Sequence, residues 1–68
     1  MRSRFDEQLA QLKCELIEMG ALCEEAIALA AKALDEADVK LAAKVAPLSG
    51  VIDRMERNIE SMCLKLLL

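Results

Sequence analysis

Two runs of apolar residues recur at alternating steps of four and three, which restricts the chain to long helices that pack side by side. Each run places an apolar stripe along one helix, and burial of such a stripe needs a partner helix. The first seam consists of Phe5, Leu9, Leu12, Leu16, Met19, Cys23, Ala26, Ala30 and Ala33. The second seam consists of Leu41, Val45, Leu48, Ile52, Met55, Ile59, Met62 and Leu66. The pattern predicts an all-α fold.

Local signals place the helix ends. Ser3 is a good N-cap and is followed three residues later by Asp6, which predicts a first helix over about 3–34. The polar segment 35–38 breaks the pattern, and Asp35 or Asp38 can cap a second helix over about 38–68. Because so short a break joins antiparallel neighbours, residues 1–68 are predicted to form a single antiparallel helical hairpin.

Proline and glycine residues interrupt both helical patterns. Pro47 removes a helical hydrogen bond, and Gly50 follows it, yet the second seam keeps its phase across both residues. We therefore predict one helix that is kinked near Pro47; the alternative is two pieces, with the later one starting near Pro47. Gly20, next to Ala21, predicts close approach of the two helices.

The chain has more apolar residues than so small a protein can bury. It has 68 residues, of which 56% are hydrophobic, and a globule of this size buries roughly 60% of its unfolded surface. Leu64, Leu66, Leu67 and Leu68 surround the end of the second helix instead of forming a stripe. Two helices cannot cover such an end, so we expect either a homo-oligomer or the front part of a longer helical bundle.

Several classes of function are disfavoured. The net charge of −3 includes no basic stripe, so nucleic-acid binding is not expected. The start of the chain does not resemble a secretory signal and no apolar run is long enough to span a bilayer, so membrane insertion is not expected. It also lacks histidine, and paired carboxylates without a nucleophile predict no enzyme activity.

Two groups of side chains invite a chemical interpretation. Asp53, Glu56 and Glu60 share one side of the second helix and form an acidic ridge. The ridge suits a metal ion or a basic partner, whereas the plainer interpretation, which we favour, is a solvated face with local pairs to neighbouring arginines. The three cysteines, Cys14, Cys23 and Cys63, are interpreted as reduced thiols in small apolar positions, with a redox or metal role as the alternative.

Several segments in order along the chain resemble the PhoU family of phosphate-uptake regulators. The opening Met1–Leu9 is similar to the start of that family, as are Glu18-Met19-Gly20 and the acidic break at residues 35–38. The most specific similarity is Ile52-Asp53-Arg54-Met55-Glu56-Arg57-Asn58-Ile59-Glu60, followed by Cys63-Leu64-Lys65-Leu66-Leu67. Full-length members consist of two repeats of a three-helix bundle, so the resemblance implies the first two helices of the first repeat.

The resemblance also implies a function. Family members are cytosolic and non-enzymatic, and they act with the high-affinity phosphate ABC transporter and a membrane sensor histidine kinase. They restrain transport and the phosphate-starvation response when phosphate is sufficient. We therefore expect a negative regulator of phosphate uptake that acts as a signalling adaptor; the alternative is a self-associating hairpin with a structural role.

A metal site is implied only in part. Some family members hold iron or zinc clusters through a Glu/Asp-x-x-x-Asp pattern, whose two carboxylates lie one turn apart. The second acid of that pattern matches Asp53, but the first falls on Ser49, a neutral hydroxyl. We therefore expect no cofactor in this chain and at most weak metal binding at Asp53, although iron or zinc fits full-length relatives.

Overall fold

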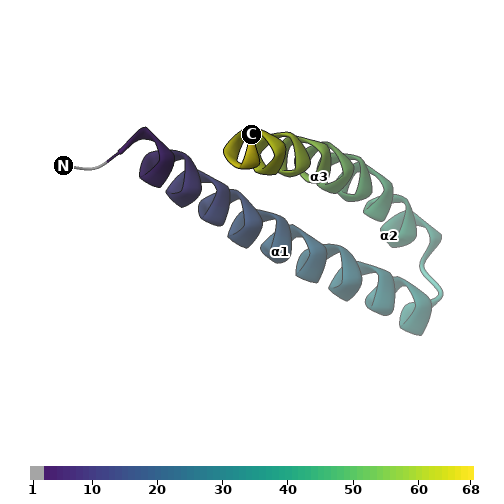
Figure 1. Ribbon diagram of the computed structural model, residues 1–68. Coiled ribbons are helices and arrows are strands. Elements are labelled where there is room, and N and C mark those ends of the chain that lie inside the picture. The colour runs from purple at the N-terminus through teal and green to yellow at the C-terminus, as the bar shows by residue number, and fades with distance from the viewer. Residues whose placement is uncertain (1–2) are drawn as a thin grey trace.

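The computed structural model describes residues 3–68 and confirms an antiparallel helical hairpin whose second arm is bent. Helix α1 spans Arg4–Glu36, α2 spans Val39–Ala43 and α3 spans Val45–Leu67. The chain turns once, between α1 and α2, so that the start of α1 and the end of α3 lie at the same end of an elongated rod (Figure 1). Met1 and Arg2, which belong to the family-like opening, lie outside the described residues.

The start of α1 follows from its cap. Ser3 has an extended backbone, and its hydroxyl oxygen accepts a hydrogen bond from the backbone N–H of Asp6 at 3.1 Å. This bond satisfies one of the N–H groups that a helix start leaves without a partner. Asp6 and Glu7 place negative charge in the first turn, where the helix dipole favours it.

The end of α1 lies two residues beyond the expected position, because the backbone reverses at Ala37. Ala37 adopts a left-handed conformation with φ of 51°. The backbone N–H of Asp38 then donates to the carbonyl of Ala33 at 2.9 Å, and that of Ala37 donates to Leu34 at 3.3 Å. This is a Schellman motif, which ends many helices but usually has glycine at the left-handed position.

The left-handed alanine leads to a stability prediction. Ala37→Gly removes the steric cost of a Cβ at positive φ, which exceeds the extra entropy that glycine loses on folding. We expect the free energy of unfolding to rise by about 0.5–1 kcal/mol. Urea unfolding followed by circular dichroism measures the change, with Ala28→Gly in the exposed middle of α1 as the control that lowers stability. A loss of stability in Ala37→Gly would contradict the prediction.

The second arm is a bent helix made of α2 and α3. The carboxylate of Asp38 caps α2 by accepting from the backbone N–H of Leu41 at 3.0 Å. Lys44 alone separates the two helices, and its own φ and ψ of −75° and −15° are helical. Pro47 is the third residue of α3, where a helix start leaves the backbone N–H without an internal partner. The proline therefore bends the arm without ending it.

The core lies along the two seams and is thin. Within residues 3–68, the buried hydrophobic residues are Leu12, Ala33 and Ile59. Apart from the buried Ile59, all members of the second seam are half-buried, as the heptad pattern predicts. The first seam is also buried or half-buried except at Phe5 and Leu16, which are 52% and 44% exposed. One helix against another therefore covers only part of the apolar surface.

The expected close approach at Gly20 is wrong for this hairpin. A Cβ built on Gly20 would meet nothing within 4 Å, so the glycine faces open space. The periodicity placed Gly20 near the seam but could not show on which side of the seam the second arm lies.

Candidate functional site

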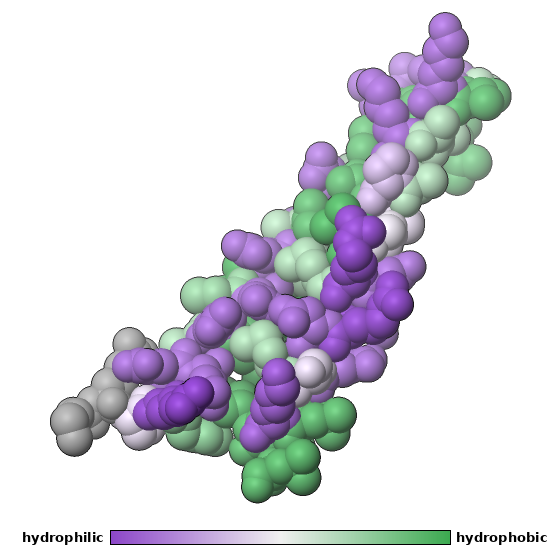
Figure 2. All heavy atoms as spheres, turned by 90° about the horizontal axis from the view of Figure 1, so that it is seen from above, coloured by the Kyte–Doolittle hydropathy of each residue, from purple (hydrophilic) through white to green (hydrophobic). Residues whose placement is uncertain are grey.

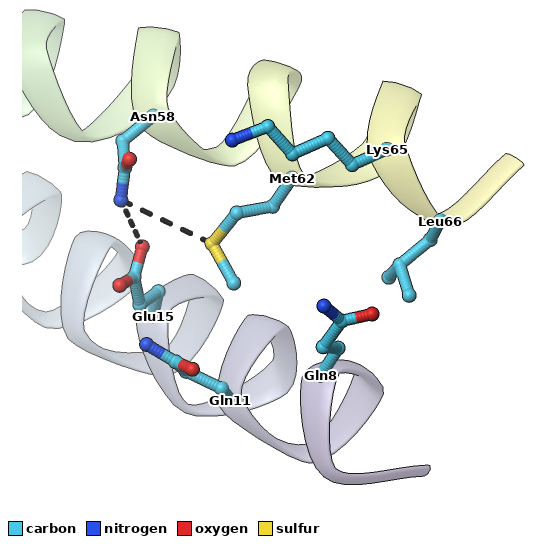
Figure 3. A pocket seen from close by; sticks show the side chains of 7 residues that line it. All are labelled: Gln8, Gln11, Glu15, Asn58, Met62, Lys65 and Leu66. Atoms are coloured by element: carbon cyan, nitrogen blue, oxygen red, sulfur yellow. Dashed lines mark hydrogen bonds between the residues drawn. The ribbon is translucent and has the colours of Figure 1, made fainter. Parts of the chain in front are cut away.

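One face of the hairpin is polar and carries a hydrogen bond between the two arms. The side-chain amide of Asn58 on α3 donates to the carboxylate of Glu15 on α1 at 2.7 Å (Figure 3). The same amide lies 3.9 Å from the sulfur of Met62. A groove of about 230 Å³ surrounds this contact and is lined by Gln8, Gln11, Glu15, Asn58, Met62, Lys65 and Leu66.

The bond between Asn58 and Glu15 joins the two arms at one level of the hairpin, and we expect it to help to select their alignment. A seam of similar apolar residues tolerates a shift of one heptad, whereas a hydrogen bond to a carboxylate forms at one alignment only. We expect Asn58→Ala to lower the free energy of unfolding by about 1 kcal/mol. A double-mutant cycle with Glu15→Ala measures the coupling, which we expect at about 0.5–1 kcal/mol. A coupling energy near zero would show that the contact does not hold the arms in register.

The opposite face carries an apolar stripe that the second arm leaves uncovered. Phe5, Leu16, Ile27 and Leu34 are separated by steps of eleven or seven residues, which bring them to nearly the same angle around α1. Their side chains are 52%, 44%, 69% and 83% exposed. We call this the α1 stripe. Charged or small polar residues are the usual occupants of such exposed positions, so an apolar row of this length indicates a surface for a partner.

The α1 stripe ends in an apolar groove near the turn of the hairpin. This groove has a volume of about 580 Å³ and is lined by Ala30, Ala33, Leu34, Ala37, Asp38, Val39, Ala42 and Val45. At the opposite end of the rod, Leu64, Leu67 and Leu68 are 62%, 85% and 103% exposed. Figure 2 shows hydrophobic residues gathered at one end of the molecule and in further patches along it.

The acidic ridge lies on α3 and is exposed. Asp53, Glu56 and Glu60 are all exposed, as is Ser49, one turn before Asp53. The guanidinium Nε of Arg57 donates to the backbone carbonyl of Asp53 at 3.4 Å and so lies against the backbone at this position.

The expected metal position does not have the donors of a resident metal site. Among residues 3–68, no group of three or more histidine, cysteine, aspartate or glutamate side chains is placed to hold a metal ion. The family-like pair of positions holds only one carboxylate, that of Asp53, because Ser49 contributes a neutral hydroxyl, a much weaker ligand for a hard cation. Weak binding at Asp53 stays a prediction, which calorimetric titration with zinc would check: we expect no saturable heat, and tight stoichiometric binding would contradict us.

The three cysteines differ in their exposure to solvent. Cys14, Cys23 and Cys63 are free thiols; Cys14 is exposed and the other two are half-buried. Cys23 belongs to the first seam, and Cys63 comes directly after Met62 of the second seam. Both positions suit a small apolar side chain, as we expected for these thiols.

These features define a helical hairpin with a polar groove between its arms and an exposed apolar row along α1. Sequence reasoning placed Phe5 and Leu16 in the first seam but did not show that they stay uncovered. It also missed the contact between Glu15 and Asn58, for which the only signal was a pair of polar residues next to the seams.

Comparison with known proteins shows the family to which this hairpin belongs. Residues 16–68 match the PhoU domain, so the chain belongs to the PhoU domain family. It is 38% identical over 64 residues to a phosphate-specific transport system accessory protein PhoU homolog from Pseudomonas putida. The aligned segment covers 94% of this chain and 25% of that protein. The proteins of the same name from Synechocystis sp. and Rhizobium meliloti are 37% and 40% identical over 62 and 57 residues.

The similarity covers nearly the whole chain but only part of each relative. It includes 91% and 84% of this chain for the Synechocystis and Rhizobium proteins, against 28% and 24% of their own lengths. The chain thus spans about a quarter of the length of the curated relatives that it matches. No solved structure matches the chain. Among residues 3–68, no helix combines the length and the apolar character needed to cross a membrane.

Proposed function

We propose that this chain acts in the regulation of phosphate uptake, as a cytoplasmic, non-enzymatic adaptor that restrains a phosphate ABC transporter and the phosphate-starvation response. The observation that supports the proposal is identity of 36–40% over most of the chain to accessory proteins of phosphate-specific transport systems. The hairpin suits an adaptor, because an apolar row along α1 stays exposed and available to a partner.

The test measures binding to the partner proteins and the activity of a phosphate-starvation promoter separately. The purified chain is mixed with the cytoplasmic ATPase of the phosphate transporter and with the cytoplasmic part of the sensor kinase, and binding is followed by calorimetry. In cells that lack their own PhoU-domain protein, the chain is expected to lower the activity of a phosphate-starvation promoter when phosphate is abundant. Arg54→Pro, which interrupts α3, is the matched variant that loses both effects. A well-expressed chain that binds neither protein and leaves the promoter unchanged would overturn the proposal.

A second candidate function is structural self-association, and one observation favours it. The four members of the α1 stripe remain 44–83% exposed in the hairpin, which leaves an apolar surface without a partner. An adaptor role and self-association are compatible, because they can use different faces.

A further inference from the structure

The bond between Glu15 and Asn58 marks one side of the hairpin. Counted from the buried Leu12, Glu15 is turned by about −60° around α1, because successive helical residues are turned by about 100°. Counted from the buried Ile59, Asn58 is turned by about −100° around α3. In antiparallel helices, turns of the same sign lead to the same side of the pair. The negative side is therefore the side of the polar groove.

The α1 stripe and the acidic ridge both lie on the other side. Leu16 is turned by about +40° from Leu12, and the rest of the α1 stripe shares nearly the same angle. The acids of the ridge are turned by about +60° to +120° from Ile59, and Glu56 is the nearest of them to α1. All of these acids are exposed. One side of the hairpin therefore carries an apolar row on α1 beside an acidic row on α3.

The two rows also lie at matching levels of the rod. Glu15 and Asn58 are level with each other, and the arms are antiparallel. Gly20, five residues after Glu15, is therefore level with Asp53, five residues before Asn58. A Cβ on Gly20 would meet nothing within 4 Å, so another element can approach the backbone of α1 closely at the level where the ridge begins.

The charge of this side is negative. Arg54 and Arg57 are turned by about −140° and +160° from Ile59, so neither arginine lies across the two rows. At the outer edge of α1, the opposite charges of Lys13 and Glu24 balance, and both side chains are exposed. The acidic ridge therefore sets the net charge, and a cover for this side needs apolar side chains for one row and basic side chains for the other.

We propose that this side of the hairpin binds a basic amphipathic helix of another protein. The apolar face of that helix packs on the α1 stripe around Leu16 and Ile27, and its lysine or arginine side chains pair with the acidic ridge. A helix suits the two straight rows, because it presents apolar residues along one face and charged residues along its edges. Gly20 gives its backbone room to approach α1.

Charge argues against the other occupants. A second copy that covered the stripe with its α3 would bring one acidic ridge against another, and an anionic membrane would be repelled in the same way. A permanently packed segment of the same protein would meet an interface of the obligate kind, which is more apolar and has few charges at its centre. An acidic row directly beside the apolar row instead suits a separate partner, for which charge speeds encounter and selects against wrong partners.

The first test titrates the full chain with peptides of known chemistry. The probe is a helical peptide of about 18 residues, about 27 Å long, with leucines along one face and lysines along its edges. One matched peptide has glutamate in place of every lysine, and another has the composition of the probe in scrambled order. Calorimetry is expected to give one probe per chain, and the glutamate peptide is expected to bind at least about tenfold more weakly. No saturable binding of the probe, or equal binding of any two peptides, would overturn the proposal.

The second test moves the charge of the ridge. Glu56→Lys combined with Glu60→Lys is expected to weaken binding of the lysine peptide about tenfold at low salt and to strengthen binding of the glutamate peptide. Glu18→Lys combined with Glu25→Lys makes the same change in net charge at exposed positions on the far side of α1. This control is expected to keep the affinity of the lysine peptide within about threefold. Equal effects of the two double variants would overturn the role of the ridge.

The third test removes an apolar contact of the stripe. Ile27→Ala is expected to weaken binding of the lysine peptide about tenfold, because it removes apolar surface that the helix covers. Ile17→Ala is the matched control, since Ile17 is exposed on α1 but turned by about 100° from Leu16. Circular dichroism confirms that both variants keep their helices. Equal affinities of the two variants would contradict the placement of the helix on the stripe.

The last test separates the proposed partner from a cover within the same protein. The relatives are about four times as long as the aligned segment, so the titration is repeated on the complete gene product that contains residues 1–68. Binding of the probe there is expected to stay within about threefold, and its loss would show that the surface is already covered and would overturn the proposal. The inference rests on the proposed adaptor role. The two fail separately, because the peptide titrations involve no phosphate-system protein and the promoter assay involves no peptide.

Discussion

Replacing Ile59 by alanine is expected to remove about 3 kcal/mol of stability, enough to unfold much of the hairpin. Ile59 is 7% exposed and is the buried residue of α3, facing α1 across the seam. The substitution removes three buried carbons and leaves a cavity that two rigid helices cannot close. A chain of this length has a total stability of roughly 3–10 kcal/mol, so the loss is a large fraction of it.

The matched control removes a similar side chain from an exposed position on the same helix. Leu64 is 62% exposed, and Leu64→Ala is expected to change the free energy of unfolding by less than about 0.5 kcal/mol. Urea unfolding of both variants at one fixed protein concentration, followed by far-ultraviolet circular dichroism, gives the comparison. Equal losses in the two variants would contradict the placement of the core along the seam.

Moving proline from the start of α3 to its interior is expected to cost about 3 kcal/mol or more. Arg54 is exposed in α3, so Arg54→Pro changes little packing. It does remove the backbone N–H that bonds the carbonyl four residues earlier, and its ring clashes with that carbonyl. We therefore expect a strong loss of helical signal and a lower urea midpoint.

The existing proline supplies the control. Pro47 lies at the third position of α3, where the helix has no internal acceptor for a backbone N–H. Pro47→Ala is expected to change the stability by at most about 1 kcal/mol and to straighten the arm, because the new N–H at residue 47 can bond the carbonyl of Ala43. If Pro47→Ala destabilised the protein as much as Arg54→Pro, the bend would be a structural requirement and our interpretation would be wrong.

Local chemistry made much of the fold predictable. Ser3 and Asp38 cap their helices as expected, since a cap needs only an acceptor side chain and the N–H groups of the next turn. The second seam runs unbroken through Pro47 because the proline lies in the first turn of α3, where a backbone N–H has no acceptor within that helix. The left-handed Ala37 was not predicted, since alanine does not usually adopt that conformation and only the closure of the turn enforces it.

The candidate interaction surface was predictable only in part. Phe5 and Leu16 belong to the same periodic seam as Leu12, and periodicity treats all three alike. In the structure Leu12 is buried, whereas Phe5 and Leu16 stay exposed on one side of the contact. A helix of 3.6 residues per turn drifts relative to a seven-residue repeat, so a straight partner covers only part of a long seam.

The sequence by itself determined that this chain forms two amphipathic helical arms, where each begins and ends to within a few residues, and that more apolar surface exists than two helices can hide. Those properties depend on neighbours one or two turns apart along the chain. The tertiary structure alone decided which side of each seam meets the other arm, which polar pair joins the arms and which apolar row remains open. The reason is physical: rotation of one helix about its axis changes no local interaction, so only packing between the arms selects it.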